Sequence, residues 1–520
     1  MEQRRKILKS AGVVGLVTAL SRIFGYFRDA SLAWVLGAGL SMDAFAVAYR
    51  IVNLFRRLVG EGAMSAAFVP VFVQYWSEHT MAELWEFVRK FFYTLALISA
   101  LIVGLEIIFA PFLAKLLAPG FEFGSAKFDL TVLLTRLMAP YLLFVALTAL
   151  LMGILNSLGR FAVPAFNPIL FNLCVCAAAV FSVHLQEPAI LIALAVLLGG
   201  ILQVASQLPF VIRDGMTFQI GFSFHHPAIR RVGNLLLPSI FGIGIIQINL
   251  MVDSFMASFL REGSISQLYY ADRVMELVLG VFTISLATVI LPNMAQSAAS
   301  KNMEELKGTL LFSLRAMAFV AIPATVGLFV LAGPIVHILF ERGRFTSFDT
   351  EATAVALAYY ALGLFFISIV RIFVSAFYSL QDTKTPVKVA FVALFTNIIL
   401  NLILMQPLKQ GGIALATSLA SALSVMQLIY IFQKRYGALD WKKSYSSVSK
   451  ILASSVLMGL FCLVCLKLFR FSIEQSLYQK AAGLFGTIGI GIVVYMALVI
   501  ILRAEEGILL SRLPFLRKKP

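Results

Sequence analysis

Residues 8–36, LKSAGVVGLVTALSRIFGYFRDASLAWVL, form an apolar run that is interrupted by Arg22, Arg28 and Asp29. The run is long enough to cross a membrane as a helix, since about 20 apolar residues suffice. A charge at the centre of a membrane helix costs about 2.5–3.5 kcal/mol on insertion scales, and such residues usually face a partner or a water-filled cavity. No small-residue cleavage site follows the run, so we interpret it as a retained first span rather than a signal peptide.

The composition of the whole chain is typical of a polytopic membrane protein. Of its 520 residues, 60% are hydrophobic and 13% are charged, whereas soluble domains are about 45–50% apolar and about 25% charged. Apolar stretches use nearly the whole length and leave no room for a soluble catalytic domain, so we expect a transporter rather than an enzyme. The net charge of +16 indicates basic loops and anionic membrane lipids as partners, not nucleic acid, because a basic soluble domain would be less hydrophobic.

Hydrophobic windows predict an all-α polytopic fold with about fourteen transmembrane helices. An even number of spans places both termini on one side of the membrane. Alternate loops differ in basic residues: Arg4, Arg230 and Lys442 belong to the richer set, and Arg261 and Lys409 to the poorer one. Basic loops stay in the cytoplasm, so both termini are predicted to be cytoplasmic. The predicted spans are residues 8–37, 42–76, 85–116, 127–157, 160–184, 188–213, 227–259, 265–297, 304–341, 348–381, 385–407, 411–434, 448–470 and 479–502.

Two helix junctions resemble each other and indicate an internal duplication. Residues 156–164 (NSLGRFAVP) align with residues 378–386 (YSLQDTKTP), and the same offset of about 222 residues places Pro70 on Pro292. Repeats with an even number of spans are parallel, and two such six-helix lobes would enclose a central cavity. We predict an N-lobe over residues 1–222, a C-lobe over 223–440, and two further helices with a basic cytoplasmic tail over 441–520.

A second set of polar residues lies in the next apolar run. Arg50, Asn53 and Arg57 have the i, i+3, i+7 spacing of one helix face, and Arg56 lies off this stripe. Asp43 precedes the stripe. The glycines of residues 60–62 (GEG) are expected to break the helix after it.

The charges in these runs have two interpretations. For any single arginine, Arg273 beside Asp272 included, an ion pair with a carboxylate explains the charge as well as a ligand does; the candidate partners are Asp29, Asp43, Glu61 and Glu276. Basic groups outnumber acids in the first two spans, however, which favours an anionic ligand. Guanidinium can form paired hydrogen bonds to phosphate oxygens, so a phosphate or diphosphate is favoured over a simple carboxylate.

A further polar group lies in the C-terminal half of the chain. Asp253, Asn397, Asn401 and Thr417 fall in apolar runs and offer carboxylate, amide and hydroxyl oxygens. Such oxygens suit a hard cation, and sodium is the commonest such ion in transporters. Hydrogen bonding between helices by Asn and Thr is an equally good explanation of the spacing.

Six short motifs give the chain a strong resemblance to the MurJ (MviN) lipid II flippases. They are SRIFGYFRD (residues 21–29), DAF (43–45), NLFRR (53–57), EGA (61–63), YADR (270–273) and FYSLQDTKTPVK (377–388). The resemblance extends over essentially the whole chain, including the two additional C-terminal helices. It implies the fold of the MOP exporter superfamily in the bacterial inner membrane. It also implies transport of the undecaprenyl-diphosphate-linked peptidoglycan precursor, lipid II, from the cytoplasmic to the periplasmic leaflet.

The resemblance also implies roles for particular residues. Arginines matching Arg22, Arg28, Arg56 and Arg273 line the family's central cavity and are needed for function, and the aspartate matching Asp43 is important. The substrate-binding residues are therefore expected to be Ser21, Arg22, Arg28, Asp43, Asn53, Arg56, Arg57 and Arg273. A family sodium site maps onto Asp253, Asn397, Asn401, Thr417 and the carbonyl near Ile413, with Asn401 in place of an aspartate. In the family the last two helices form a hydrophobic groove for the lipid tail. No other cofactor is expected.

Two alternatives remain open at this point. A cation-coupled multidrug exporter of the same superfamily would have a pore lined by aromatic and acidic residues rather than arginines. A scaffold that docks cell-wall synthesis proteins would not transport at all, and it would leave the arginines in the spans unexplained. For the leading function, the membrane potential, alone or with a cation gradient, is expected to drive an alternating-access cycle.

Overall fold

The computed structural model describes residues 2–56, 63–468 and 476–506, which contain sixteen α-helices and no strand. Each apolar range predicted from the sequence coincides with one helix or with two consecutive helices. Ten segments of the described chain are long and apolar enough to cross a membrane. The predicted all-α membrane fold is therefore confirmed, whereas the exact number of spans stays a prediction.

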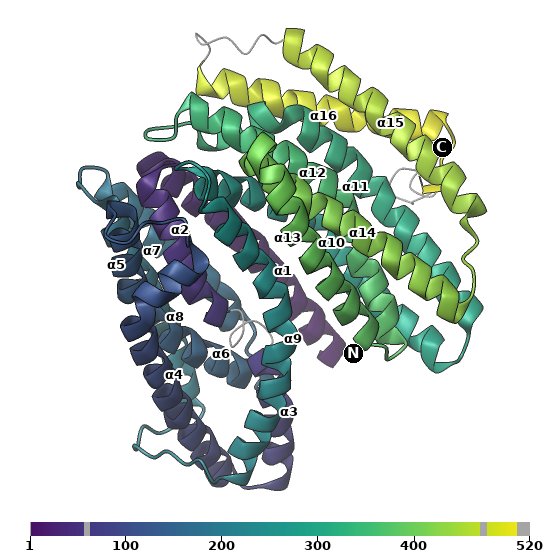
Figure 1. Cartoon of the computed structure of the whole chain (residues 1–520). Coiled ribbons are helices and arrows are strands. Elements are labelled where there is room, and N and C mark those ends of the chain that lie inside the picture. Colours follow the sequence, from purple (N-terminus) through teal and green to yellow (C-terminus); the bar gives the residue numbers. More distant parts are fainter. Residues whose placement is uncertain (1, 57–62, 469–475, 507–520) are drawn as a thin grey trace. The chain divides into compact units, whose positions relative to one another are not determined.

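The helices are grouped into two compact units. The first unit comprises Met1–Ser266 and Arg342–Phe345, and the second comprises Gln267–Glu341 and Thr346–Pro520. The lobe boundaries predicted from the sequence, after residues 222 and 440, stay a prediction. In Figure 1 the sequence colouring runs from purple to teal through the first unit and from teal to yellow through the second.

The first unit contains the first nine helices. Its largest apolar core lies among α3, α4, α6, α8 and α9, where Phe68 stacks on Phe87 and Phe91. The charged helix α1 packs against α7, and α2 packs against α5. The helices are α1 (Glu2–Leu36), α2 (Leu40–Phe55), α3 (Ala63–Glu78), α4 (Met81–Leu117), α5 (Ala126–Met138), α6 (Tyr141–Ser157), α7 (Ala162–Ser182), α8 (Pro188–Arg213) and α9 (Pro227–Ala257).

The second unit is built around α11, α12 and α14. Helix α12 packs against both α11 and α14, and α13 packs against α14. The last two helices lie side by side, and both also contact α11 (Figure 1). The helices are α10 (Ser264–Ala299), α11 (Met303–Phe340), α12 (Ser347–Ser379), α13 (Lys384–Leu408), α14 (Gln410–Tyr436), α15 (Trp441–Leu468) and α16 (Leu477–Ile501).

Two of the predicted spans each contain two helices. The predicted span 127–157 is confirmed as one segment long and apolar enough to cross a membrane, Ala126–Ser157, but its helix is interrupted, because α5 ends at Met138 and α6 begins at Tyr141. Pro140 lies between them; it has no N–H to donate, and its ring clashes with the preceding turn. The predicted helix 42–76 is likewise two helices, α2 and α3. The break predicted at residues 60–62 lies outside the described residues.

The end of α1 is held by a specific turn. Gly37 has φ +65°, a left-handed conformation that favours glycine, and its N–H donates to the Ala33 carbonyl at 2.9 Å. The Arg344 N–H donates to the Trp34 carbonyl at 2.9 Å. The short segment Arg342–Phe345 is thereby attached to the end of α1, which explains why it belongs to the first unit.

Candidate functional site

Arg28 is paired with its neighbour in the chain. Its Nε and Nη2 donate to Oδ1 of Asp29 at 2.9 and 2.7 Å, and its Nη1 donates to Oδ1 of Asn172 at 3.2 Å. The two charged side chains are 16% and 8% exposed. The ion-pair interpretation is thus confirmed for Arg28 in this conformation.

Asn172 of α7 was not singled out from the sequence, yet it connects two turns of α1. Its Nδ2 donates to the Ser21 carbonyl at 3.2 Å while its Oδ1 accepts from Arg28. A Cβ at Gly25 would lie 3.6 Å from the same Nδ2, so the glycine leaves room for the asparagine. The available signal was an amide within the apolar run of α7, and such a residue usually bonds across helices.

Arg22 differs from Arg28. Its side chain is half-buried, and within the described residues no ion pair or hydrogen bond is found for its guanidinium group. The neighbouring Ser21 hydroxyl donates to the Thr18 carbonyl of its own helix at 2.9 Å. Arg22 therefore holds a charge available to an anion in the first unit.

On α2, an arginine beside the predicted stripe bonds to one of its residues. Arg56, which was placed off the stripe, donates from Nε to Oδ1 of Asn53 at 2.5 Å, because side chains three apart on a helix are neighbours. Arg50 is half-buried. Arg57 and Glu61 lie outside the described residues. Arg56 and Asn53 are thus brought together, and the role of Arg57 stays a prediction.

Asp43 connects three elements of the first unit and is 1% exposed. Its Oδ1 accepts from the Ser266 hydroxyl at 2.5 Å and the Ser266 N–H at 2.9 Å. Its Oδ2 accepts from the Gly263 N–H at 2.8 Å and from Nζ of Lys127 at 3.3 Å. Lys127 of α5 also lies 3.7 Å from Glu262. The sequence did not indicate these partners, and both carboxylate oxygens are engaged by them.

Arg273 lies on α10 in the second unit. Its Nη1 is 2.6 Å from Oε2 of Glu276, and its guanidinium carbon lies 5.0 Å from the centre of the Tyr269 ring. The paired side chains are 25% and 42% exposed. Glu276, one of the candidate carboxylate partners, thus pairs with Arg273, and the pair is partly exposed rather than dry.

The candidate cation residues of the second unit form a hydrogen-bonded chain between α13 and α14. Asn401 Nδ2 donates to Asn397 Oδ1 at 3.0 Å, and Asn397 Nδ2 donates to the Thr417 hydroxyl at 3.1 Å. That hydroxyl donates to the Ile413 carbonyl at 3.2 Å. Asp253 is buried on α9 of the first unit. The four grouped residues bond to one another, as expected of interhelical hydrogen bonding, and their binding of a sodium ion stays a prediction.

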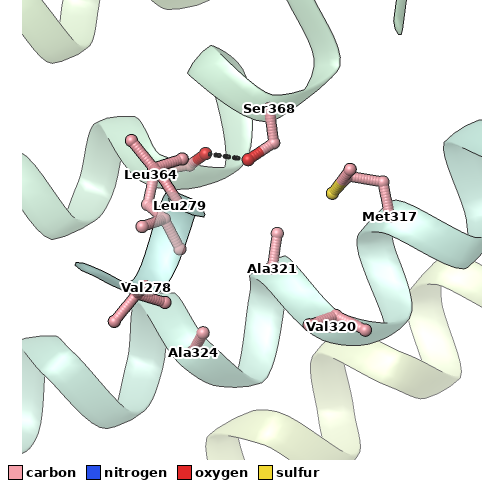
Figure 2. Close-up of a pocket in the computed structure, with 8 residues that line it drawn as sticks. All are labelled: Val278, Leu279, Met317, Val320, Ala321, Ala324, Leu364 and Ser368. Atoms are coloured by element: carbon pink, nitrogen blue, oxygen red, sulfur yellow. Dashed lines mark hydrogen bonds between the residues drawn. The ribbon is translucent and has the colours of Figure 1, made fainter. Parts of the chain in front are cut away.

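The second unit also holds a small apolar pocket, shown in Figure 2. Its volume is about 10 Å³, and Val278, Leu279 and Met317 are among its lining residues. The Ser368 hydroxyl, its polar side-chain group, donates to the Leu364 carbonyl at 2.8 Å (Figure 2). A space of this size holds about one water molecule, so it cannot bind a phosphate headgroup.

A larger cavity lies in the first unit, between α3 and the start of α9. Its volume is about 270 Å³, and its lining includes Tyr75, His79, His226 and Arg231. His79 stacks on Tyr75 with ring centres 3.8 Å apart. Burial lowers the pKa of His226, and the charge of Lys90 acts in the same direction. His79 and His226 lie far apart in the sequence, so the sequence did not indicate this cavity. The fold brings the two histidines together.

The comparison with known proteins decides the family. Residues 32–481 match the family model described as "Lipid II flippase MurJ". The chain belongs to this family. It is 35% identical over 507 residues to the "Probable lipid II flippase MurJ" of Vibrio cholerae, covering 96% of each chain. It is 34% identical over 423 residues to the "Lipid II flippase MurJ" of Burkholderia cenocepacia, covering 80% of this chain and 82% of that one.

Solved structures agree with the family. "Lipid II flippase MurJ, inward closed conformation" superposes with a TM-score of 0.78 at 29% identity, over 94% of this chain and 98% of that one. A multidrug resistance MATE family transporter of the MOP superfamily, in an inward-facing conformation, superposes with a TM-score of 0.67 at 13% identity, over 82% and 99%. The second likeness shows the fold alone. Together with the ten apolar segments, the family places this multi-pass transporter in the bacterial inner membrane.

Proposed function

We propose that the chain is a flippase that moves lipid II from the cytoplasmic to the periplasmic leaflet of the inner membrane. The observation that carries this proposal is the match to relatives named as lipid II flippases over nearly the whole chain. The MATE transporter at 13% identity supports only a common fold, so the multidrug exporter is not favoured. A transporter of this family needs no catalytic site.

The guanidinium groups of the first unit supply the chemistry for a diphosphate. Arg22 has no carboxylate partner among the described residues, so its charge is available for the phosphate oxygens. A hydrogen bond to a charged group contributes about 1.5–3 kcal/mol, and a guanidinium can form two to one phosphate. We assign to Arg22 the first contact with the diphosphate of the lipid.

Arg28 and Arg273 bind carboxylates on their own helices, and these pairs can be exchanged for a ligand. The carboxylates are one and three positions away from their arginines on the same helix. Rotation of the side chains therefore separates each pair, and no helix has to move. A partly exposed pair such as Arg273–Glu276 stabilises the fold by only about 0.2–1 kcal/mol. A diphosphate carries more charge than one carboxylate, and it therefore competes well for either arginine.

The remaining predictions of the sequence enter the proposal as follows. Basic loops place both termini in the cytoplasm, and the membrane potential resets the empty carrier, since one charge crossing 100 mV gains about 2.3 kcal/mol.

Side chains such as Leu460, Leu463 and Phe485 of α15 and α16 are exposed and suit contact with membrane lipids and the polyprenyl tail. Sodium binding and docking by cell-wall synthesis proteins both stay predictions.

The decisive experiment measures translocation of labelled lipid II in liposomes that contain only this protein. Loss of one charge-assisted hydrogen bond of about 1.5–3 kcal/mol corresponds to a rate lowered about 10- to 100-fold in Arg22→Ala. Arg22→Lys keeps the charge without the paired geometry and should be intermediate. Arg230→Ala is the matched control, because this exposed arginine lies at the start of α9.

Three results would contradict the proposal. A wild-type rate in correctly folded Arg22→Ala removes the assigned diphosphate contact. Movement of organic cations but not of lipid II would favour the multidrug exporter. A folded protein that moves neither would favour the scaffold.

A further inference from the structure

Glu106 is a carboxyl group buried in the middle of membrane helix α4. The residue is 3% exposed, and within the described residues neither Oε1 nor Oε2 has a hydrogen-bond partner. At 1.5 Å per residue, it lies about 17 Å from the end of α4 at Leu117, slightly more than half the hydrocarbon thickness of about 30 Å. Glu106 therefore lies well inside a helix that is long and apolar enough to cross the membrane.

The two faces of α4 show where this carboxyl group points. Leu105, Phe109 and Phe112 are exposed, as expected of a surface that contacts lipid. Val103, Glu106 and Ala110 have i, i+3, i+7 spacing and are buried. Val103 packs against Ala139 and Leu142, so the buried face of α4 meets the junction of α5 and α6. Glu106 is enclosed by protein rather than by lipid.

Among the residues that the structure describes, no charged group pairs with Glu106. Helix α4 packs against α2, α3, α5, α6 and α9, and no ion pair or hydrogen bond connects Glu106 to any described residue of these helices. An ionised carboxylate in such a place is unfavourable, and the group becomes neutral by taking up a proton. The titratable and charged residues on the five helices are Asp43, Tyr49, Arg50, Tyr75, Glu78, Lys127, Asp129, Arg136, Tyr141, Arg230, Arg231 and Asp253.

The helix is weakened next to this carboxyl group. Pro111 lies inside α4 and has no N–H, so the Ile107 carbonyl lacks its helical donor. Nε of Arg136, an exposed side chain of α5, donates to that carbonyl at 3.2 Å. That carbonyl is therefore held by a side chain of another helix rather than by its own helix, and α4 can bend beside Glu106.

We propose that Glu106 is a proton-binding site that the transport cycle uses. The carboxyl group is protonated in the conformation described here; when α4 bends at Pro111 and admits water, its O–H bond breaks and the proton passes to water. After the carrier opens to the opposite side of the membrane, the carboxylate takes up a proton from the water there and its O–H bond forms again, so each cycle carries one proton across. The coupling of Glu106 to the transport cycle rests on the proposed transport of lipid II. The protonated state of Glu106 can be tested without transport.

The first experiment is infrared difference spectroscopy of the purified full chain in lipid nanodiscs at neutral pH. The carbonyl stretch of a protonated carboxylic acid is expected in the wild type and should be lost in Glu106→Gln, which has the same shape. Glu122→Gln is the matched control, because Glu122 is exposed. An unchanged acid band in folded Glu106→Gln overturns the proposal.

The second experiment measures lipid II and proton movement together in proteoliposomes with an imposed pH gradient and no voltage. With one proton per lipid, one pH unit changes the equilibrium ratio of lipid II between the leaflets about tenfold. Glu106→Gln should lose this dependence. Lipid II movement without proton movement in the wild type overturns the coupling. If the wild type moves no lipid II, the transport function fails, and the infrared result still decides whether Glu106 holds a proton.

Discussion

Replacing Asp43 by alanine is expected to destabilise the first unit strongly. The carboxylate is 1% exposed and accepts four hydrogen bonds, from the hydroxyl and N–H of Ser266, the N–H of Gly263 and Nζ of Lys127. Asp43→Ala leaves two backbone N–H groups and one ammonium group without this acceptor, in a place closed to water. The change also removes the connection between α2, α5 and the start of α10.

The magnitude follows from the number of stranded groups. Each buried donor that loses its acceptor costs about 1–3 kcal/mol, so two backbone donors and the ammonium cost about 3–9 kcal/mol together. Removing one partner of a buried ion pair costs about 3–5 kcal/mol, and this value lies within the range summed from the donors. Asp43→Asn keeps one acceptor oxygen but turns an NH₂ group towards Gly263 or Ser266, so it should cost about half as much.

The assay is thermal unfolding of the full chain in one detergent at one scan rate, since unfolding of large proteins is often irreversible. Asp129→Ala is the control, because this exposed aspartate should change the stability by at most about 1 kcal/mol. A double-mutant cycle with Lys127→Ala should give a coupling of about 0.5–3 kcal/mol. Melting of Asp43→Ala within a degree of the wild type would refute the reasoning. Stable Asp43→Asn without transport would instead assign the residue to the substrate.

Two further predictions concern packing and pH. Gly200→Ala should destabilise by about 1–3 kcal/mol, because its Cβ would lie 2.6 Å from the Tyr141 ring; Gly104→Ala has nothing within 4 Å and should be neutral or stabilising in the same melting assay. Burial acts to raise the pKa of Asp382, but hydrogen bonds from Thr385 outweigh it and hold the pKa below its usual value. Because the folded pKa is the lower one, this stabilisation is complete above the unfolded value and is lost as the pH falls through the folded value. Acid titration of the melting temperature should therefore show a smaller loss in Asp382→Asn, and an identical loss would contradict the prediction.

The sequence predicted those parts of the fold that depend on local composition. Apolar length alone located the helices, because a membrane helix must satisfy its backbone within about 20 apolar residues. The spacing of Arg273 and Glu276 likewise predicted their pair, since three residues along a helix bring side chains together. The break at Pro140 carried a signal in the proline itself, but the apolar run continues through it and concealed the break.

The rest of the site depends on contacts between distant residues. Asn172 meets Arg28 across 144 positions, and Lys127 meets Asp43 across 84. Nothing in the neighbourhood of either residue in the chain indicates its partner. Glu106 did carry a signal, as an acid in the apolar run of α4, yet its importance depends on having no partner. That property follows only from the packing of every helix around it.

The position of its carboxylate partner distinguishes an arginine whose partner a ligand can replace from an arginine whose ion pair holds the fold together. Arg315 of α11 bridges to Glu505 at 3.1 Å and Glu506 at 3.2 Å, beyond the end of α16, and thereby connects parts of the second unit that are far apart in sequence. A ligand that displaced these carboxylates would have to separate packed helices. Arg28 and Arg273 take their carboxylates from one to three positions away on the same helix, so an anion can replace the partner by side-chain rotation alone. An arginine with a partner on its own helix is therefore consistent with a carrier, and the transport proposal depends on this distinction rather than on every guanidinium being free.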